Sequence, residues 1–229
     1  MIPLFKTHFS IGRSLLTPER CFELAKESNL SEIVFVEDSF SGFRKINLLA
    51  TENGFRFRFG IRLLARQAPE LIESKIVLFA KNNDGLRSLR EIFTKMNIDG
   101  GVWDIDKSML KDIQVVIPFY DSFVHKNLHE FGVHNIELPD LVYFVEDNGH
   151  PFDYQILRGL ERFKEKKQSV KSIFYEKKEN FKEYQFYRSN SQRQAGKIPV
   201  FTSPELENCG SDKFCWEDFQ LRNQIVLSY

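Results

Sequence analysis

The feature that most constrains this chain is a repeated alternation of short apolar runs with segments of helical period. At residues 17–19 the sequence Thr-Pro-Glu supplies an N-cap, a first-turn proline and a first-turn acid, which together predict the start of a helix. Residues 33–36 are Ile-Val-Phe-Val, an apolar run rich in β-branched side chains that predicts a buried strand. A strand, a helix and a second strand in succession are typical of a parallel βαβ unit.

The same alternation continues through most of the chain. Gly54 predicts the end of one helix, and Asn82 predicts the cap of another whose apolar positions share one face. Several βα units in one chain favour a barrel or a doubly wound sheet over a sandwich. The predicted strands are residues 33–36, 55–64, 75–80, 114–118 and 141–145, with a short strand and a loop in residues 2–14; the predicted helices start at residue 17 and cover residues 45–53, 86–96, 152–166 and the region around 216–221.

Composition excludes several classes of protein. The chain has 229 residues, 42% of them hydrophobic, which is enough for a continuous core, and its many phenylalanines are expected there. It contains no apolar run of about 18 residues, so we expect a soluble, cytoplasmic protein. Cys21, Cys209 and Cys215 are too scattered for a disulfide framework. The formal net charge is zero, so binding to nucleic acid would have to come from a local patch.

One such patch is predicted in residues 162–197, where lysines alternate with phenylalanines and tyrosines. Lysines interleaved with aromatic rings can hold a single-stranded nucleic acid by neutralising phosphates and stacking on bases. The alternative is an amphipathic helix with a solvated lysine face. The nucleic-acid candidates are Lys166, Lys167, Lys171, Lys177, Lys178 and Tyr184, and Trp216 and Phe219 in the last helix are predicted to dock a partner.

Three stretches carry a family resemblance. They are residues 4–19, residues 33–63, and residues 76–89, whose sequence Ile-Val-Leu-Phe-Ala-Lys-Asn-Asn-Asp-Gly-Leu-Arg-Ser-Leu is the most specific of the three. They resemble the PHP (polymerase and histidinol phosphatase) domain of bacterial DNA polymerase III alpha subunits. The resemblance implies an α/β fold, a distorted (β/α)7 barrel with an added C-terminal segment and a metal cleft at the C-terminal ends of the strands. Residues 1–160 would form the barrel core, and residues 161–229 would complete the barrel and add the docking helix.

The metal ligands of the family are poorly matched. His8 stands at the first histidine of the family's His-x-His pair, but Ser10 replaces the second. Glu37 and Asp38 replace the family's Asp-His turn, and Arg62 stands where the family has a bridging glutamate. Because a guanidinium is permanently charged, Arg62 is expected to point into the cluster of His8, Glu37 and Asp38 and to leave a vestigial, salt-bridged cleft. Residues 146–150, Glu-Asp-Asn-Gly-His, resemble the family's Asn-Asp-x-His turn, so His150 is a further candidate ligand.

Three functions stay open at this point. The first is a non-catalytic or weakly catalytic accessory module of a DNA replication machinery, of the kind phages carry. It would need no cofactor, and its expected partners are a replicative DNA polymerase or another replication protein, with single-stranded DNA as a further candidate. The second is an active metal-dependent phosphoesterase or 3′-5′ exonuclease that uses His8, Asp38 and His150 around manganese or zinc. The third is a protein-interaction module unrelated to replication. Of His125, His129 and His134, the first two could lie on one face of a helix and bind zinc, but the spacing forces no third ligand nearby, so they are interpreted as a surface pair.

Overall fold

The computed structural model describes residues 1–67, 73–128, 136–138, 140–191 and 211–227. The chain divides into two compact units that interleave along the sequence. The first consists of Met1–Arg58, Asp147–His150 and Val170–Tyr229, and the second of Phe59–Glu146 and Pro151–Ser169.

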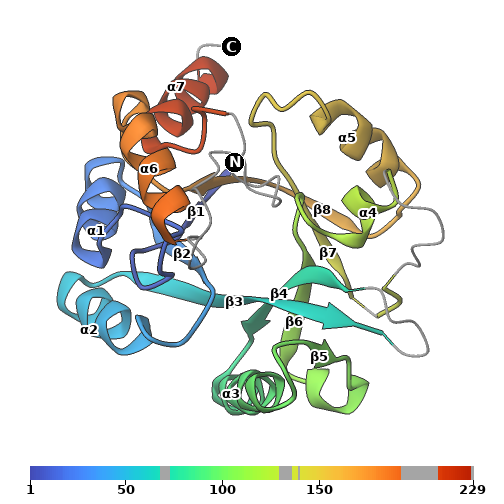
Figure 1. Ribbon diagram of the computed structural model, residues 1–229. Helices are drawn as coiled ribbons and strands as arrows, with labels where there is room; N and C mark the ends of the chain where they lie inside the picture. Colours follow the sequence, from blue (N-terminus) through green and yellow to red (C-terminus); the bar gives the residue numbers. More distant parts are fainter. Residues whose placement is uncertain (68–72, 129–135, 139, 192–210, 228–229) are drawn as a thin grey trace. The chain divides into compact units, whose positions relative to one another are not determined.

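The first unit is built on parallel strands (Figure 1). Strand β1 (Ile2–Phe5) pairs in parallel with β2 (Glu32–Glu37) and with the second half of β8 (Lys166–Ile173). Because all three strands run the same way, their carboxyl ends meet at one edge of the sheet. The helices of this unit are α1 (Pro18–Glu27), α2 (Phe43–Asn53), the short η2 (Lys178–Asn180), α6 (Phe181–Ser191) and α7 (Trp216–Leu227).

Capping signals predicted from the sequence are confirmed in both units. The Thr17 hydroxyl accepts a hydrogen bond from the backbone N–H of Arg20 at 3.2 Å, and Pro18 is the first residue of α1. Gly54 ends α2 in the left-handed conformation, with φ of 69°, which a glycine adopts without strain. The Asn82 side chain accepts from the N–H of Gly85 at 2.9 Å and starts α3 (Asn83–Ile98).

The second unit contains the mixed part of the sheet. Strand β4 (Ser74–Ala80) runs antiparallel to both β3 (Arg56–Arg66) and β6 (Ile113–Ile117). Strand β7 (Val142–Val145) pairs in parallel with β6 and with the first half of β8. The remaining elements are α3, β5 (Trp103–Asp104, parallel to β3), η1 (Lys107–Leu110), α4 (Phe123–Lys126) and α5 (Asp153–Glu161).

The predicted α/β class is confirmed. The strand order is β2-β1-β8-β7-β6-β4-β3-β5, with an additional pairing of β2 with β3. The (β/α)7 succession is not confirmed, since β3 and β4 are neighbouring antiparallel strands. Only residues 67–73 connect them, which is too short for the crossover that a parallel pair requires, so the two strands are antiparallel.

The structure corrects the secondary structure predicted for residues 152–173. Helix α5 ends at Glu161, and residues 166–173 form strand β8 instead of a helix. The lysines of this segment suggested a solvated helix face, but β8 is an interior strand between β1 and β7, and residues 170–173 are all buried. The helical prediction holds further on, in α6, where Tyr184 and Arg188 are buried one turn apart.

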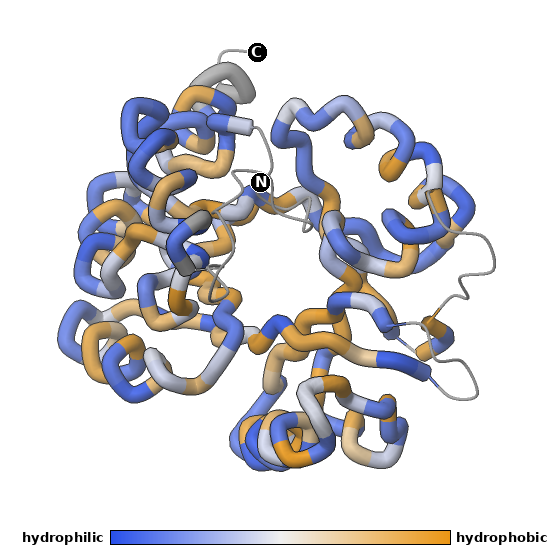
Figure 2. The backbone as a smooth tube through the Cα atoms, viewed as in Figure 1, coloured by the Kyte–Doolittle hydropathy of each residue, from blue (hydrophilic) through white to orange (hydrophobic). Residues whose placement is uncertain are grey.

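Aromatic side chains form much of the core, as their number predicts. In the first unit the Phe5 ring lies 6.1 Å from the Phe35 ring and 5.3 Å from the Trp216 ring system. Figure 2 shows the hydrophobic residues concentrated on the strands, while the helices also carry hydrophilic residues. Cys21 and Cys215 are buried free thiols, and Cys209 lies outside the described residues. Within the described ranges, no helix is both long and apolar enough to cross a membrane.

Candidate functional site

The residues predicted to form the vestigial cleft follow strands β1 and β2 of the first unit. Lys6 and Thr7 come directly after β1, and Glu37 and Asp38 lie at the end of β2. Because β1 and β2 are parallel and hydrogen-bonded, with Phe5 opposite Phe35, these four residues meet at the same edge of the sheet. This is the edge at which α/β folds place ligands and catalytic groups.

Glu37 is fully buried and accepts hydrogen bonds with both carboxylate oxygens. The backbone N–H of Thr7 donates to Oε1 at 2.8 Å, and the Ser10 hydroxyl donates to Oε2 at 2.5 Å. Ser10 Oγ in turn accepts from the backbone N–H of Asp38 at 2.9 Å. Burial raises the pKa of Glu37 above its ordinary value, although the charge of Lys6 and the hydrogen bonds from Ser10 and Thr7 act in the opposite direction. Ser10 therefore links the two acids.

Asp38 is held by cations of the same unit. Lys6 Nζ lies 2.6 Å from Asp38 Oδ1, with the lysine side chain 4% exposed and the aspartate side chain 36% exposed. Arg13 Nε lies 3.7 Å from the other oxygen, Oδ2. A buried ammonium needs such a partner, because an unpaired charge in the interior is costly.

His8 does not join the hydrogen bonds and ion pairs that surround Glu37 and Asp38. It is exposed, and its ring stacks on the ring of Phe9 with the centroids 4.6 Å apart. Its backbone N–H donates to the carbonyl of Leu16 at 2.8 Å. Thr7 is buried behind the end of β1, whereas His8 lies in the turn that follows and faces solvent.

A second polar cluster lies on β8, α7 and residues 147–150 of the first unit. Lys171 is fully buried; its Nζ lies 2.5 Å from Asn148 Oδ1 and 2.8 Å from Asp218 Oδ2. Arg222 Nε donates to the same oxygen of Asp218 at 2.8 Å, and Arg222 Nη1 lies 3.1 Å from Asp147 Oδ2. Lys178 Nζ lies 3.9 Å from Asp218 Oδ1, so the ion pairs of this cluster join three cations and two carboxylates.

The cations of this second cluster keep its acids ionised. Burial by itself would raise the pKa of Asp218, but the hydrogen bond from Lys171 and the charges of Lys171 and Arg222 outweigh it and hold that pKa below its ordinary value. For Asp147, burial is likewise outweighed by the hydrogen bond from the N–H of Gly149 and by the charge of Arg222, so its pKa is also lowered. Both acids act as acceptors of internal hydrogen bonds.

The turn that resembles the family's late ligand motif is part of this cluster. Asn148 is fully buried, and its carbonyl accepts from the Ser211 hydroxyl. His150 is 9% exposed, and its ring centroid lies 5.7 Å from that of Phe214. Glu146 is buried and belongs to the second unit.

Arg62, predicted to neutralise the cleft acids, belongs to the second unit. Its Nη2 donates to the carbonyl of Tyr120 at 3.3 Å and lies 3.2 Å from Asp121 Oδ2. Both Arg62 and Asp121 are largely buried. The predicted contact of Arg62 with Glu37 and Asp38 stays a prediction, whereas Lys6 is a cation that the structure places beside Asp38.

A divalent metal centre needs at least three ligating side chains close together. No three His, Cys, Asp or Glu side chains lie close enough to hold an ion, as far as the described residues extend. The set proposed from the sequence, His8, Asp38 and His150, therefore does not come together as a ligand group. The physical reason is visible in each member: His8 faces solvent, Asp38 is paired with Lys6, and His150 packs near an aromatic ring. Of the other candidate histidines, His125 is buried, and His129 and His134 lie outside the described residues.

The structure separates the nucleic-acid candidates into three groups. Lys171 and Tyr184 are buried, so their proposed contacts with nucleic acid are corrected: Lys171 pairs with Asp218, and the Tyr184 ring stacks on Phe174. Lys166 and Lys167 are exposed at the start of β8 in the second unit. Lys177 and Lys178 line a groove of the first unit.

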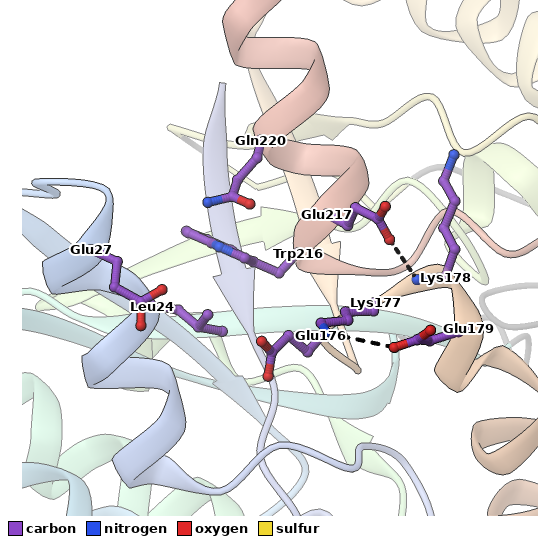
Figure 3. A pocket seen from close by; sticks show the side chains of 9 residues that line it. All are labelled: Leu24, Glu27, Glu176, Lys177, Lys178, Glu179, Trp216, Glu217 and Gln220. Carbon is purple, nitrogen blue, oxygen red and sulfur yellow. Dashed lines mark hydrogen bonds and ion pairs between the residues drawn. The ribbon is translucent and has the colours of Figure 1, made fainter.

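That groove has a volume of about 460 Å³ and lies among α1, α7 and residues 176–179 (Figure 3). The polar rim of the groove carries both acidic and basic side chains. The backbone N–H of Lys178 donates to Glu217 Oε2 at 2.9 Å, and the Arg20 guanidinium donates to both carboxylate oxygens of Glu176. The groove is lined by Leu24, Glu27, Glu176, Lys177, Lys178, Glu179, Trp216, Glu217 and Gln220.

Trp216 and Phe219, the predicted docking residues, are each 2% exposed. Their ring systems stack on each other at 4.8 Å, and Trp216 also packs on Phe5 of β1. The prediction that these two side chains contact a partner is therefore corrected: α7 turns its aromatic face toward its own unit. The partner itself stays a prediction.

Sequence reasoning missed Lys6, Arg13 and Asp218. A signal existed for Lys6, since it directly follows an apolar strand, where a charged side chain is buried only with a partner. No comparable signal existed for Asp218, because its partner Lys171 is remote in the sequence and the two meet only through the packing of α7.

No family model and no curated protein matches the chain. Solved structures are similar to it at low identity, among them the following two. A candidate metal-dependent phosphoesterase from Bifidobacterium adolescentis is 17% identical over 42% of this chain, with a TM-score of 0.33, and the match spans about a third of that protein (34%). An amidohydrolase from Chromobacterium violaceum, with bound sulfate and no metal, is 12% identical over 76% of this chain and 87% of its own, with a TM-score of 0.43. At this level neither likeness carries a conclusion about activity.

Proposed function

We propose that this chain is a non-catalytic α/β module whose strand-end acids are held by internal lysines instead of metal ions. The observation that carries the proposal is the contact of Lys6 Nζ with Asp38 Oδ1 at 2.6 Å, beside a buried Glu37 that already accepts two hydrogen bonds. A carboxylate that serves a metal must leave an oxygen free to coordinate it. Here that position beside Asp38 is filled by an ammonium group.

Electrostatics supports the same proposal. A divalent ion coordinated by Asp38 would lie within a few ångströms of the Lys6 charge, and like charges at that separation in a partly buried site repel by several kcal/mol, about 4 kcal/mol per pair of unit charges at an effective dielectric constant of about 20. The ion would also compete with Arg13, which lies 3.7 Å from the second oxygen of Asp38. Binding would therefore require Lys6 to leave its buried position.

The enzymatic alternative, an active phosphoesterase or exonuclease, receives less support from the geometry. It requires His8, Asp38 and His150 around one ion, and these residues do not form a ligand group. The buried Lys171 lies at the corresponding late turn, bonded to Asn148 and Asp218. Both clusters thus already contain the positive charge that the alternative assigns to a metal.

For such a module, the role left is to bind another macromolecule. The sequence resemblance to the polymerase III alpha subunit is the support for a replicative polymerase as the partner and for a place in DNA replication. A partner unrelated to replication is the competing proposal. Co-purification of the tagged full-length chain from its native host, followed by identification of the bound proteins, distinguishes the two.

The decisive experiment measures metal directly. Full-length protein purified without chelators is analysed for bound metal and then melted with and without 1 mM Mn²⁺. We expect less than one metal ion per chain and an unchanged melting temperature. Binding would be easy to see, since a metal ion at 100 times its Kd would stabilise the fold by about 2.7 kcal/mol and raise the melting temperature by about 5–10 °C.

A matched pair of variants tests the role of Lys6. Lys6→Gln removes the buried cation, whereas Lys26→Gln removes an exposed lysine of α1. Mn²⁺ should raise the melting temperature of Lys6→Gln more than that of Lys26→Gln. If the unaltered chain binds one or more ions and loses them in Asp38→Asn, the proposed function is wrong.

A further inference from the structure

An exposed basic corner lies where α5 ends and β8 begins, in the second unit. Five cations and two acids occupy residues 158–167, which leaves a local charge of +3 in a chain whose formal net charge is zero. All five cations are exposed. We define the basic corner as Arg158, Arg162, Lys164, Lys166 and Lys167.

The cations of the basic corner differ from several other exposed cations in forming no ion pair with an acid in the described part of the chain. Elsewhere Lys45 pairs with Glu19 at 2.8 Å, and Arg58 pairs with Glu32 at 3.0 Å. None of the five forms an ion pair with an acid within the described part of the chain. Glu161 and Glu165 offset only part of their charge, and an external anion is the partner that would neutralise the remainder.

Helix stability explains only some of these charges. Arg158 and Arg162 lie at the C-terminal end of α5, where cations interact favourably with the helix dipole. Lys164, Lys166 and Lys167 lie beyond the helix and gain nothing from it. No side-chain hydrogen bond or ion pair among the described residues accounts for the charges of Lys164 and Lys166, and Lys167 donates to a backbone carbonyl and not to an acid.

The backbone that carries the corner is fixed by the core. The Phe163 ring stacks on Tyr143 at 5.0 Å and meets the edge of Phe123 at 5.8 Å. Lys167 lies opposite Tyr143 in the β7–β8 ladder, and its Nζ donates to the carbonyl of Phe163. A ligand that binds here would meet cations whose backbone is already ordered, which lowers the entropic cost of binding.

An exposed aromatic ring lies beside the charges. Tyr154 of α5 is 67% exposed, and the Arg158 guanidinium lies 5.9 Å from its ring centroid, one helical turn away. The Arg162 guanidinium similarly lies 5.3 Å from the ring of Phe163. A flat ring next to planar guanidinium groups offers a stacking surface for a base, which an anionic lipid headgroup would not use.

We infer that the basic corner binds single-stranded nucleic acid, through contacts of its cations with phosphates and of Tyr154 with a base. This activity goes beyond the proposed function and does not depend on it. Binding to three to five phosphates predicts that log K falls against log salt with a slope of about −2 to −3.5, so raising salt from 50 to 200 mM weakens binding by about 20-fold or more.

The test uses the full-length protein and a fluorescein-labelled 20-nucleotide dT strand, followed by fluorescence anisotropy across a salt series. The corner variant is Lys164→Ala/Lys166→Ala/Lys167→Ala. The matched control, Lys95→Ala/Lys107→Ala/Lys111→Ala, removes the same charge from exposed lysines of the same unit. We expect the corner variant to bind at least tenfold more weakly with a shallower salt slope, and the control to stay within about threefold of the unaltered chain.

Two further measurements make the outcome decisive. Tyr154→Ala should weaken binding by about tenfold while leaving the salt slope unchanged, since it removes a base contact but no charge. Equal losses in the corner and control variants, or no binding of the strand at 50 mM salt, would overturn the inference. The inference would also be overturned if the unaltered chain did not bind the strand but bound phosphatidylserine vesicles, and the corner variant lost that vesicle binding. Far-ultraviolet circular dichroism of each variant verifies that it is folded.

Discussion

The buried lysine of β8 allows the sharpest test of how the polar clusters stabilise this fold. Lys171→Met keeps the length of the side chain but removes its charge. In the structure the Lys171 side chain is 0% exposed and its partner Asp218 is 8% exposed, so both charges were desolvated on folding. Removing one member of a buried pair costs about 3–5 kcal/mol, because the other charge stays in the interior.

Two details place the expected loss within that range. Asn148 loses the donor to its buried Oδ1, a loss of about 1–3 kcal/mol for an unsatisfied buried acceptor. Asp218 keeps the hydrogen bond from Arg222 at 2.8 Å, which limits the penalty on its charge. We therefore expect about 3 kcal/mol, equivalent to a fall in melting temperature of about 6–12 °C.

Urea unfolding at pH 7, followed by tryptophan fluorescence and circular dichroism, measures the loss. The control is Lys166→Met, the same substitution on the same strand at an exposed position, which should change stability by no more than about 0.5 kcal/mol. In the double variant Lys171→Met/Asp218→Asn the loss should be smaller than the sum of the single losses by about 1 kcal/mol or more, since the orphaned charge is gone.

The pH dependence gives an independent check. The pKa of Asp218 is below its ordinary value of 3.8, so its ionised form is the one that the folded state favours. Its stabilising contribution is present above pH 4 and is lost as the pH falls through the folded-state pKa, so the difference between the unaltered chain and Lys171→Met should shrink on acidification. Equal stability of Lys171→Met and Lys166→Met at pH 7 would refute the reasoning.

Three other substitutions probe the rest of the fold. Trp216→Ala should destabilise by about 3–5 kcal/mol, because the ring is buried against Phe5; a loss no larger than that of the exposed Leu221→Ala would show that the ring does not pack there. Glu37→Gln removes a carboxyl whose pKa is raised by burial. The unaltered chain should therefore lose stability relative to this variant as the pH rises above about 4.5 and through the folded-state pKa of Glu37. Urea unfolding at pH 4, 5.5 and 7 measures the difference, and a gain in relative stability with rising pH would contradict the burial argument. Gly85→Ala would place a Cβ 2.1 Å from the carbonyl oxygen of Asp112, so we expect a loss of about 1–3 kcal/mol by thermal melting, and a neutral result would contradict that close approach.

The candidate site shows how far the sequence could lead. The positions of Glu37 and Asp38 at the end of a predicted strand, and of Ser10 after another, identified groups that do meet: Ser10 bonds to both residues. The identity of the neutralising cation beside Asp38 did not follow, because Lys6 and Arg62 are both cations after or within strands, and which of them approaches a given acid depends on strand pairing. The burial of Trp216 and Tyr184 was missed for the same reason.

What the sequence alone determined was local and periodic. Helix caps at Thr17 and Asn82, the stop at Gly54, and the apolar run of β2 follow from side chains that act on their own neighbourhood, so they could be predicted one segment at a time. Tertiary structure decided the rest: that the lysine-bearing segment 166–173 is an interior strand, and that Lys171 meets Asp218 across the unit. A buried charge can be stable only beside its counter-charge, and where that partner lies is a property of the packed elements, not of the order of residues along the chain.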